Sequence, residues 1–217
     1  AVLLPLIAPF PYRNTVSIMQ MPEVWTRYFS DRTGWLLNFS DPALIPRYLH
    51  FIASAVAIGG LAIALYFEIR KRRGATDGEA WIKLGCKWFT VATIINFGFG
   101  FRFLGALPAA AYNAATLGGK IFFILVVGSV VNIIPSMVSA QTGRIIPAAA
   151  WALVTVLLMT LARDILRLTY LKPYFSLAEL PYVPQYSPFI VFLLAFVGAG
   201  FLIGWMLKTV WNAKEVA

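Results

Sequence analysis

The chain has 217 residues and a net charge of +9; 60% of its residues are hydrophobic and only 12% are charged. A soluble domain of this size could not bury so much apolar surface, so the composition excludes a soluble enzyme, a disordered chain and a disulfide-rich secreted module. The positive charges lie in short loops and at helix ends, which favours membrane orientation over nucleic-acid binding.

The first 42 residues are expected to form a unit of their own. Residues 1–10 are apolar but too short to span a membrane, so we interpret them as the tail of a preceding helix. Residues 14–30 have the pattern of a short amphipathic helix lying on the outer membrane surface.

The remainder, 43–217, is expected to be a bundle of five membrane-spanning helices. Each apolar stretch exceeds the roughly 20 residues that cross a hydrocarbon core. In lipid every backbone polar group must be paired within its own segment, which predicts helices and an all-α, polytopic transmembrane fold. The expected spans are 43–69, 81–107, 112–137, 145–170 and 187–211.

The densest basic run in the chain is RKRR at 70–73, directly after the first span. The positive-inside rule places such a run in the cytoplasm. Five crossings then put residues 13–42 outside and the C-terminus inside.

Ionisable residues inside the spans are the most informative feature. With 1.5 Å of rise per residue, they lie roughly 5–12 Å from the outer helix ends, at one depth. A charge in hydrocarbon is costly unless it reaches the headgroups, pairs with another charge or lines a polar cavity. The residues are Arg47, His50, Arg102, Lys120, Arg163, Asp164 and Arg167.

Two interpretations of these residues remain open. Arg102 and Arg167 are close enough to the interface to extend into the headgroup region. Lys120 follows two glycines and precedes the apolar run IFFILVV. This context favours pairing of Lys120 with an internal anion, such as a haem propionate, a quinone headgroup or a partner's carboxylate. His50 is the only histidine and Cys86 the only cysteine, which excludes a bis-histidine haem or a cysteine-based cluster built by this chain alone.

Three motifs together resemble subunit I of the cytochrome bd family of quinol oxidases. The first is Met19-Gln20-x-Pro22. The second is Arg47-x-x-His50, preceded by Asn38, which resembles the segment whose histidine ligates the low-spin b haem. The third is Asp164-x-x-Arg167, placed like an acidic-x-x-Arg pair near a second haem.

The resemblance implies b-type haem bound by His50 and quinone as substrate, with Asp164 as a weaker metal ligand. Arg47, Lys120 and Arg163 would pair with the haem propionates. It also implies the inner membrane of a prokaryote, further membrane subunits that supply missing N-terminal helices, and an outer redox partner such as a c-type cytochrome.

The chain also departs from the family pattern. No methionine follows Lys120, and only a few residues occupy the place of the quinol-binding loop after the second span. These departures favour an electron-transfer subunit over an oxygen-reducing one. The alternative is a cofactor-free membrane anchor or scaffold of such a complex.

Overall fold

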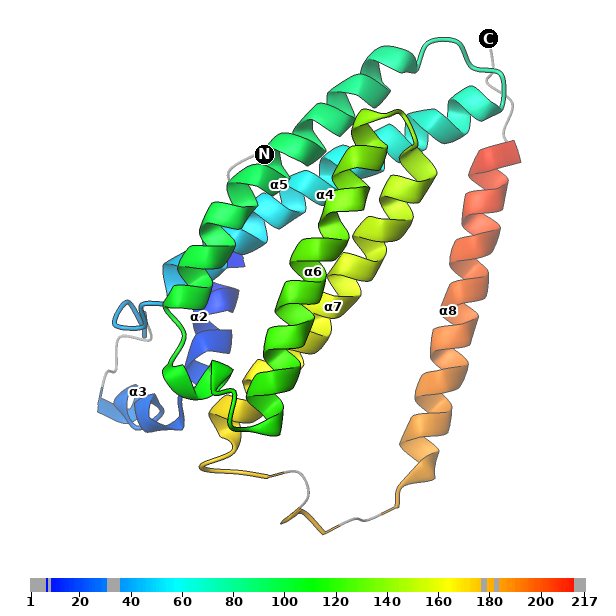
Figure 1. The fold of residues 1–217 in the computed structure, drawn as a ribbon. Helices are drawn as coiled ribbons and strands as arrows, with labels where there is room; N and C mark the ends of the chain where they lie inside the picture. Colours follow the sequence, from blue (N-terminus) through cyan, green and yellow to red (C-terminus); the bar gives the residue numbers. More distant parts are fainter. Residues whose placement is uncertain (1–6, 8, 31–35, 177–178, 182–183, 213–217) are drawn as a thin grey trace. The chain divides into compact units, whose positions relative to one another are not determined.

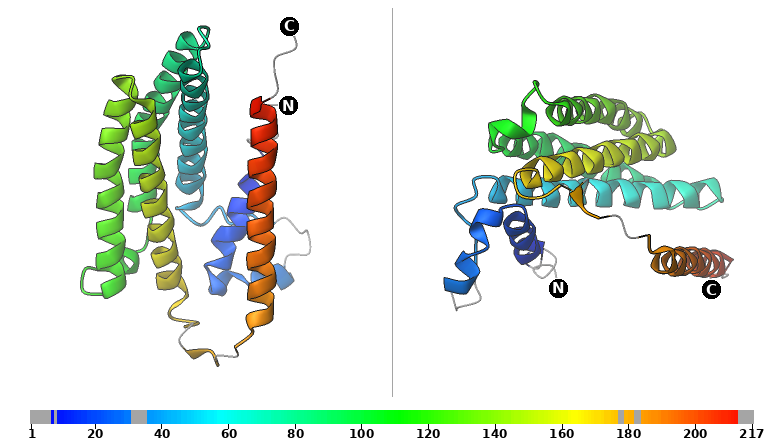
Figure 2. Two further views of the ribbon diagram at one scale, coloured as in Figure 1. Left: turned by 90° about the vertical axis from the view of Figure 1, so that its right-hand side faces the viewer. Right: turned by 90° about the horizontal axis from the view of Figure 1, so that it is seen from below.

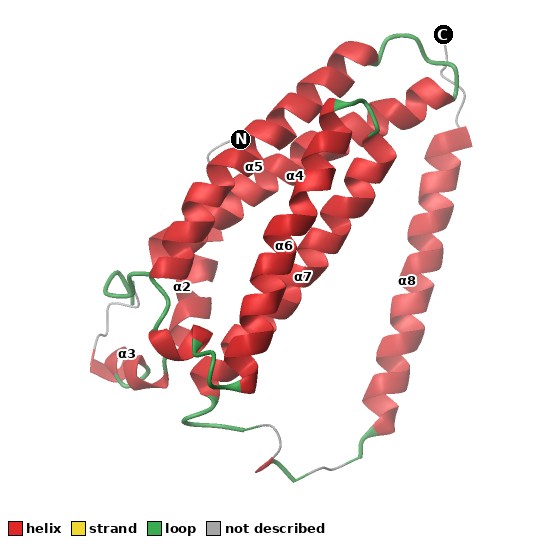
Figure 3. Cartoon of the chain, in the orientation of Figure 1, coloured by secondary structure: helices red, strands yellow, loops and turns green. Residues whose placement is uncertain are grey.

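The computed structural model describes residues 7, 9–30, 36–176, 179–181 and 184–212, and within them the regular structure is entirely helical (Figures 1 and 3). Short elements open the chain, and five long helices follow. The elements are α2 (Pro9–Met19), η1 (Pro22–Val24), α3 (Arg27–Ser30), α4 (Leu44–Arg72), α5 (Glu79–Gly105), η2 (Ala109–Tyr112), α6 (Leu117–Gln141), α7 (Ile145–Leu171) and α8 (Tyr186–Asn212).

The five long helices are long and apolar enough to cross a membrane, as the sequence predicted. The chain therefore has the architecture of a multi-pass membrane protein. By contacts it divides into residues 1–176 and residues 177–217. The first unit contains the outer segment and four spans, and the second contains α8.

The third span begins five residues later than expected, at Leu117 instead of 112. Residues Ala109–Tyr112 form the separate 3-10 helix η2 after the extended Pro108. Thr116 then caps α6, because its hydroxyl accepts a 3.1 Å hydrogen bond from the Gly119 amide. At its other end α6 continues through Pro135 to Gln141.

In the first unit, α4 and α5 form one helical hairpin, and α6 and α7 form another (Figure 2). Contacts between α4 and α7 and between α5 and α6 join the two hairpins. Gly60 and Gly85 allow the closest approach: a Cβ atom on Gly85 would lie 2.5 Å from the Gly60 carbonyl oxygen. Small residues at such crossings are typical of membrane helices.

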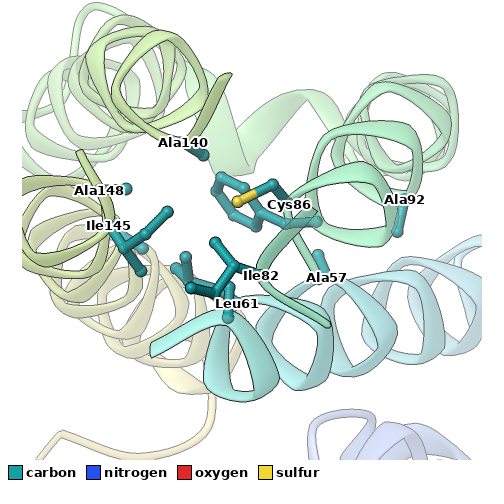
Figure 4. Packing of buried hydrophobic residues seen from close by; sticks show 11 residues of the cluster. Ala57, Leu61, Ile82, Cys86, Ala92, Ala140, Ile145 and Ala148 are labelled. Carbon is teal, nitrogen blue, oxygen red and sulfur yellow. The ribbon is translucent and has the colours of Figure 1, made fainter. Parts of the chain in front are cut away.

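Two hydrophobic clusters fill the interior of this unit. One surrounds Phe89 and Cys86 in the half nearer the 73–78 loop, and Figure 4 shows its side chains converging between the two hairpins. The other surrounds Phe122 and Leu166 in the opposite half. Alanine is the commonest member, which keeps the helices close, while many large apolar side chains face outward, as expected for contact with lipid.

The single amphipathic helix expected over 14–30 is instead three short elements. α2 begins earlier, at Pro9, and ends at Met19, because Pro22 cannot continue the helical hydrogen bonding. Its buried residues are polar, Asn14 and Ser17, while Tyr12 and Met19 are exposed. The expected helix tail at residues 1–10 lies largely outside the described residues.

The polar face of α2 is tied to the segment that precedes α4. The Asn14 side chain accepts from the Asn38 amide at 2.7 Å and donates to the Leu36 carbonyl at 2.6 Å. The Ser17 hydroxyl donates to the Asp41 carboxylate, whose other oxygen accepts from the Ala43 amide at 2.9 Å. These bonds hold α2 against the start of α4.

Replacing Asp41 should loosen this attachment. In Asp41→Ala the buried Ser17 hydroxyl and Ala43 amide lose their acceptor, which should cost about 1–3 kcal/mol for each unpaired group. Thermal unfolding in detergent measures the change. Asp77→Ala is the matched control, because Asp77 is exposed and only weakly paired with Arg70 at 3.9 Å. Equal melting temperatures for the two variants would contradict the prediction.

Candidate functional site

Arg47 and His50 are the only two of the seven predicted site residues that the structure partly buries. They lie one turn apart on α4, as their spacing predicted. The other five predicted residues are exposed on the surface of the described chain: Arg102, Lys120, Arg163, Asp164 and Arg167.

Helix α5 forms the wall beside His50. Its Gly100 presents no side chain there, and a Cβ atom would lie 3.2 Å from both Cε1 and Nδ1 of the imidazole. The imidazole also stacks on Phe103, with ring centroids 6.5 Å apart and an interplanar angle of 28°. Gly100 is therefore the position at which α5 leaves space for the imidazole ring.

A chain of hydrogen bonds fixes this wall to α4. The Asn96 side-chain amide donates to the Ser54 hydroxyl at 2.8 Å, and that hydroxyl donates to the His50 carbonyl oxygen at 2.8 Å. Asn96 thus forms a hydrogen bond between the two helices. The bonds hold α5 in register with the turn of α4 that carries His50.

Two arginines complete the cluster, and each lies over an aromatic ring. The Arg47 guanidinium is 5.2 Å from the Phe103 ring centroid, and that of Arg13, on α2, is 4.1 Å from the Phe51 centroid. Such contacts are worth about 0.5–2 kcal/mol, so they offset only part of the cost of burying a charge. Neither arginine forms an ion pair with a described residue.

Four buried polar atoms in this cluster have no hydrogen-bond partner among the described residues: Arg13 Nε, Arg47 Nη1, His50 Nδ1 and Asn96 Oδ1. Electrostatic interactions connect Arg13 with Arg47 and with His50, and His50 lies close enough to the backbone and side chain of Asn96 to interact with both as a hydrogen-bond donor. Buried polar groups are almost always paired, and each unpaired one costs about 1–3 kcal/mol. We name these four residues the His50 cluster.

The His50 cluster has an excess of positive charge. Arg163, on α7, acts electrostatically on both Arg13 and Arg47, and the nearby acid is Asp41. Among the residues that the structure describes, three guanidinium groups against one carboxylate leave a net charge of +2. Burial, followed by repulsion from Arg163, holds the pKa of Arg13 below its usual value. Chemically, the arrangement suits an anion flanked by an imidazole.

The other predicted residues are not brought into the cluster. The side chains of Arg102, Lys120, Asp164 and Arg167 make no hydrogen bond or ion pair with any described residue. The exposure of Arg102 and Arg167 agrees with the headgroup interpretation. Lys120, expected to face an internal anion, is also exposed. Asp164 has no companions for a metal site, since no group of three His, Cys, Asp or Glu side chains occurs in the described part of the chain.

Arg13 is the site residue that sequence reasoning missed. It lies in the segment assigned to the outer surface, and only the bonds of Asn14 and Ser17 to the segment before α4 bring it beside Phe51. One signal was available: Arg13 is the only charged residue among the first 22, and it lies four positions before the buried Ser17, on the same helical face.

Comparison with protein-family models, with curated protein sequences and with solved structures found no match to this chain. The resemblance to subunit I of the cytochrome bd family therefore stays a prediction from three motifs.

Proposed function

We propose that the chain is a membrane subunit of a respiratory electron-transfer complex, which binds b-type haem at His50 and passes electrons between membrane quinone and an outer redox partner. The observation that carries the proposal is the His50 cluster, with its unpaired buried atoms and its excess of positive charge. Water can satisfy a hydrogen bond, but it cannot balance the charge of two arginines. An anionic group can do both.

The residues of the cluster fit a b-type haem. His50 is partly buried and has an unpartnered ring nitrogen, which suits an axial ligand. Arg13 and Arg47 have buried N–H groups free to donate, which suits carboxylates such as propionates. When bound, the haem supplies one-electron transfer at its iron. Asp164 and Lys120 are exposed, so we leave them out of the proposed ligand set.

The arginines would also adjust the energetics of the site. Positive charge next to a redox centre favours its reduced form, because reduction adds an electron. Arg13, Arg47 and Arg163 would therefore raise the reduction potential of a group held at His50. A raised potential suits a site that accepts electrons from quinol.

The charge of the loop between α4 and α5 also supports the proposal. The RKRR run at 70–73 favours a cytoplasmic position for the α4–α5 loop, which puts the His50 cluster near the outer face of a prokaryotic inner membrane. Quinone would reach the cluster from the bilayer, and a partner such as a c-type cytochrome would receive electrons outside. Other membrane subunits would cover α2, whose Tyr12 and Met19 are exposed.

A reduced-minus-oxidised absorption spectrum of the protein, purified with its native partners, tests this function. We expect a b-type band that appears with dithionite and also with quinol. A spectrum without a b-type band would contradict haem binding. A band that dithionite produces but quinol does not would contradict the role in quinol oxidation.

The space beside His50 gives a second test, with a matched control. In Gly100→Val the new side chain collides with the imidazole, so we expect lower haem content and a shifted band. Gly98→Val introduces the same side chain two residues away, where a Cβ atom would meet nothing within 4 Å. Equal haem content in both variants, measured per mole of protein, would place the haem elsewhere.

The second candidate function is a cofactor-free anchor. The observation that favours it is the exposure of five of the seven predicted site residues, which suits contact with headgroups or partner subunits. This function predicts that electron transfer through the complex is unchanged when His50 is replaced.

A further inference from the structure

A second polar site lies at the opposite end of the four-helix unit. Lys71 is 21 residues after His50 on α4, about 30 Å along the helix. There the end of α4, the start of α5 and the α6–α7 turn enclose a groove of about 470 Å³. Its polar lining residues are Glu68, Lys71, Glu79, Lys83, Lys87, Thr90 and Gln141.

The acids of the groove already have partners. Arg72 donates to Glu68 at 2.7 Å, and the Lys83 ammonium lies 3.2 Å from the Glu79 carboxylate. Lys71 and Lys87 make no hydrogen bond or ion pair with any described residue. Two ammonium groups, one from each helix of the hairpin, therefore remain to interact with a bound anion.

The rest of the lining mixes polar and apolar side chains. The Gln141 side chain donates to the Thr90 hydroxyl, which joins α6 to α5. The apolar residues Ile82, Val91 and Ala140 alternate with the polar ones along the helices. The groove therefore offers charged partners to an anionic headgroup and apolar contacts to an acyl chain.

Aromatic residues place the groove at the membrane interface. Trp81 and Trp88 on α5 are about half exposed, at 49% and 53%, and tryptophan concentrates where hydrocarbon meets headgroups. Basic pockets between helices at this level suit lipid phosphates. A smaller neighbouring pocket in the α4–α5 loop shares Lys71 and Glu79 with the groove.

We propose that this groove binds a phosphate group, supplied by an anionic phospholipid, with Lys71 and Lys87 as its counter-charges. The phosphate lies between the two ammonium groups, and the acyl chain contacts the apolar residues of the lining. The site is independent of the His50 cluster, so it stands whether or not haem is bound there.

Melting temperatures in nanodiscs test the proposal. The protein, with its native partners, is placed in phosphatidylcholine alone, in phosphatidylcholine with phosphatidylglycerol, and in phosphatidylcholine with inorganic phosphate. Phosphatidylglycerol should raise Tm by on the order of 5 °C, as expected for a ligand that binds only the folded state. The variant Lys71→Gln with Lys87→Gln should lose this rise.

The control removes the same charge at the other end of the unit, by Lys120→Gln with Lys172→Gln, and should keep the rise. A response to inorganic phosphate that also needs Lys71 and Lys87 would support the phosphate site, with soluble phosphate as its source. An equal rise in both double variants, or no rise in the wild type, would overturn the proposal.

Discussion

Replacing His50 with alanine is expected to abolish the b-type band of the purified complex while the protein still inserts and assembles. His50 is the only histidine of the chain, so no second imidazole can replace it. The imidazole lies against Gly100 and Phe103, and its Nδ1 atom forms no well-aligned hydrogen bond with a described residue. Haem per mole of protein measures the effect.

Two comparisons make this result specific. Arg102→Gln changes an exposed residue of α5 at a similar depth and should retain the band. Recovery of the assembled His50→Ala complex in wild-type yield, as a single species on size-exclusion chromatography, rules out unfolding as the cause of the loss. If the band survives in His50→Ala, the haem is held elsewhere, and if electron transfer also survives, the chain is an anchor.

Gly85→Ala is expected to disrupt the α4–α5 hairpin. The new Cβ atom would lie 2.5 Å from the Gly60 carbonyl oxygen and 2.8 Å from the Ala64 amide nitrogen. Both are backbone atoms of α4, which cannot rotate away as a side chain can. The helices must separate, which should cost about 3 kcal/mol, at the upper end of the usual cost of overpacking.

The matched control for this prediction is Gly59→Ala, one residue from Gly60, where a Cβ atom would meet nothing within 4 Å. Alanine is the better helix former, so this variant should be as stable as the wild type or up to about 1 kcal/mol more stable. Yield from the membrane and thermal unfolding in detergent compare the two. A Gly85→Ala protein as stable as Gly59→Ala would contradict the close packing of the hairpin.

The spans were predictable from the sequence because lipid imposes a simple rule on length and hydropathy. The errors occurred at span ends, where local chemistry decides. Thr116 caps α6, which begins five residues after the expected start, and the alanine-rich stretch Ala109–Tyr112 forms η2 instead. Pro22 similarly divides the expected outer helix.

The candidate site was predictable only in part. The spacing of Arg47 and His50 placed both on one face of α4, and the structure confirms that. Arg13 belongs to the His50 cluster because the hydrogen bonds of Asn14 and Ser17 hold α2 against the segment before α4. No local sequence pattern reveals those tertiary bonds. Lys120 is exposed on the described chain, and its depth along the helix alone does not determine which face its side chain occupies.

An experimental density map of the protein, purified from its native membrane, would show directly whether a haem occupies the His50 cluster. We expect density for a flat group between the helices, bonded to His50 and contacted by the guanidinium groups of Arg13 and Arg47. Density for water or acyl chains alone in that space, with the arginines paired to carboxylates of other subunits, would contradict it.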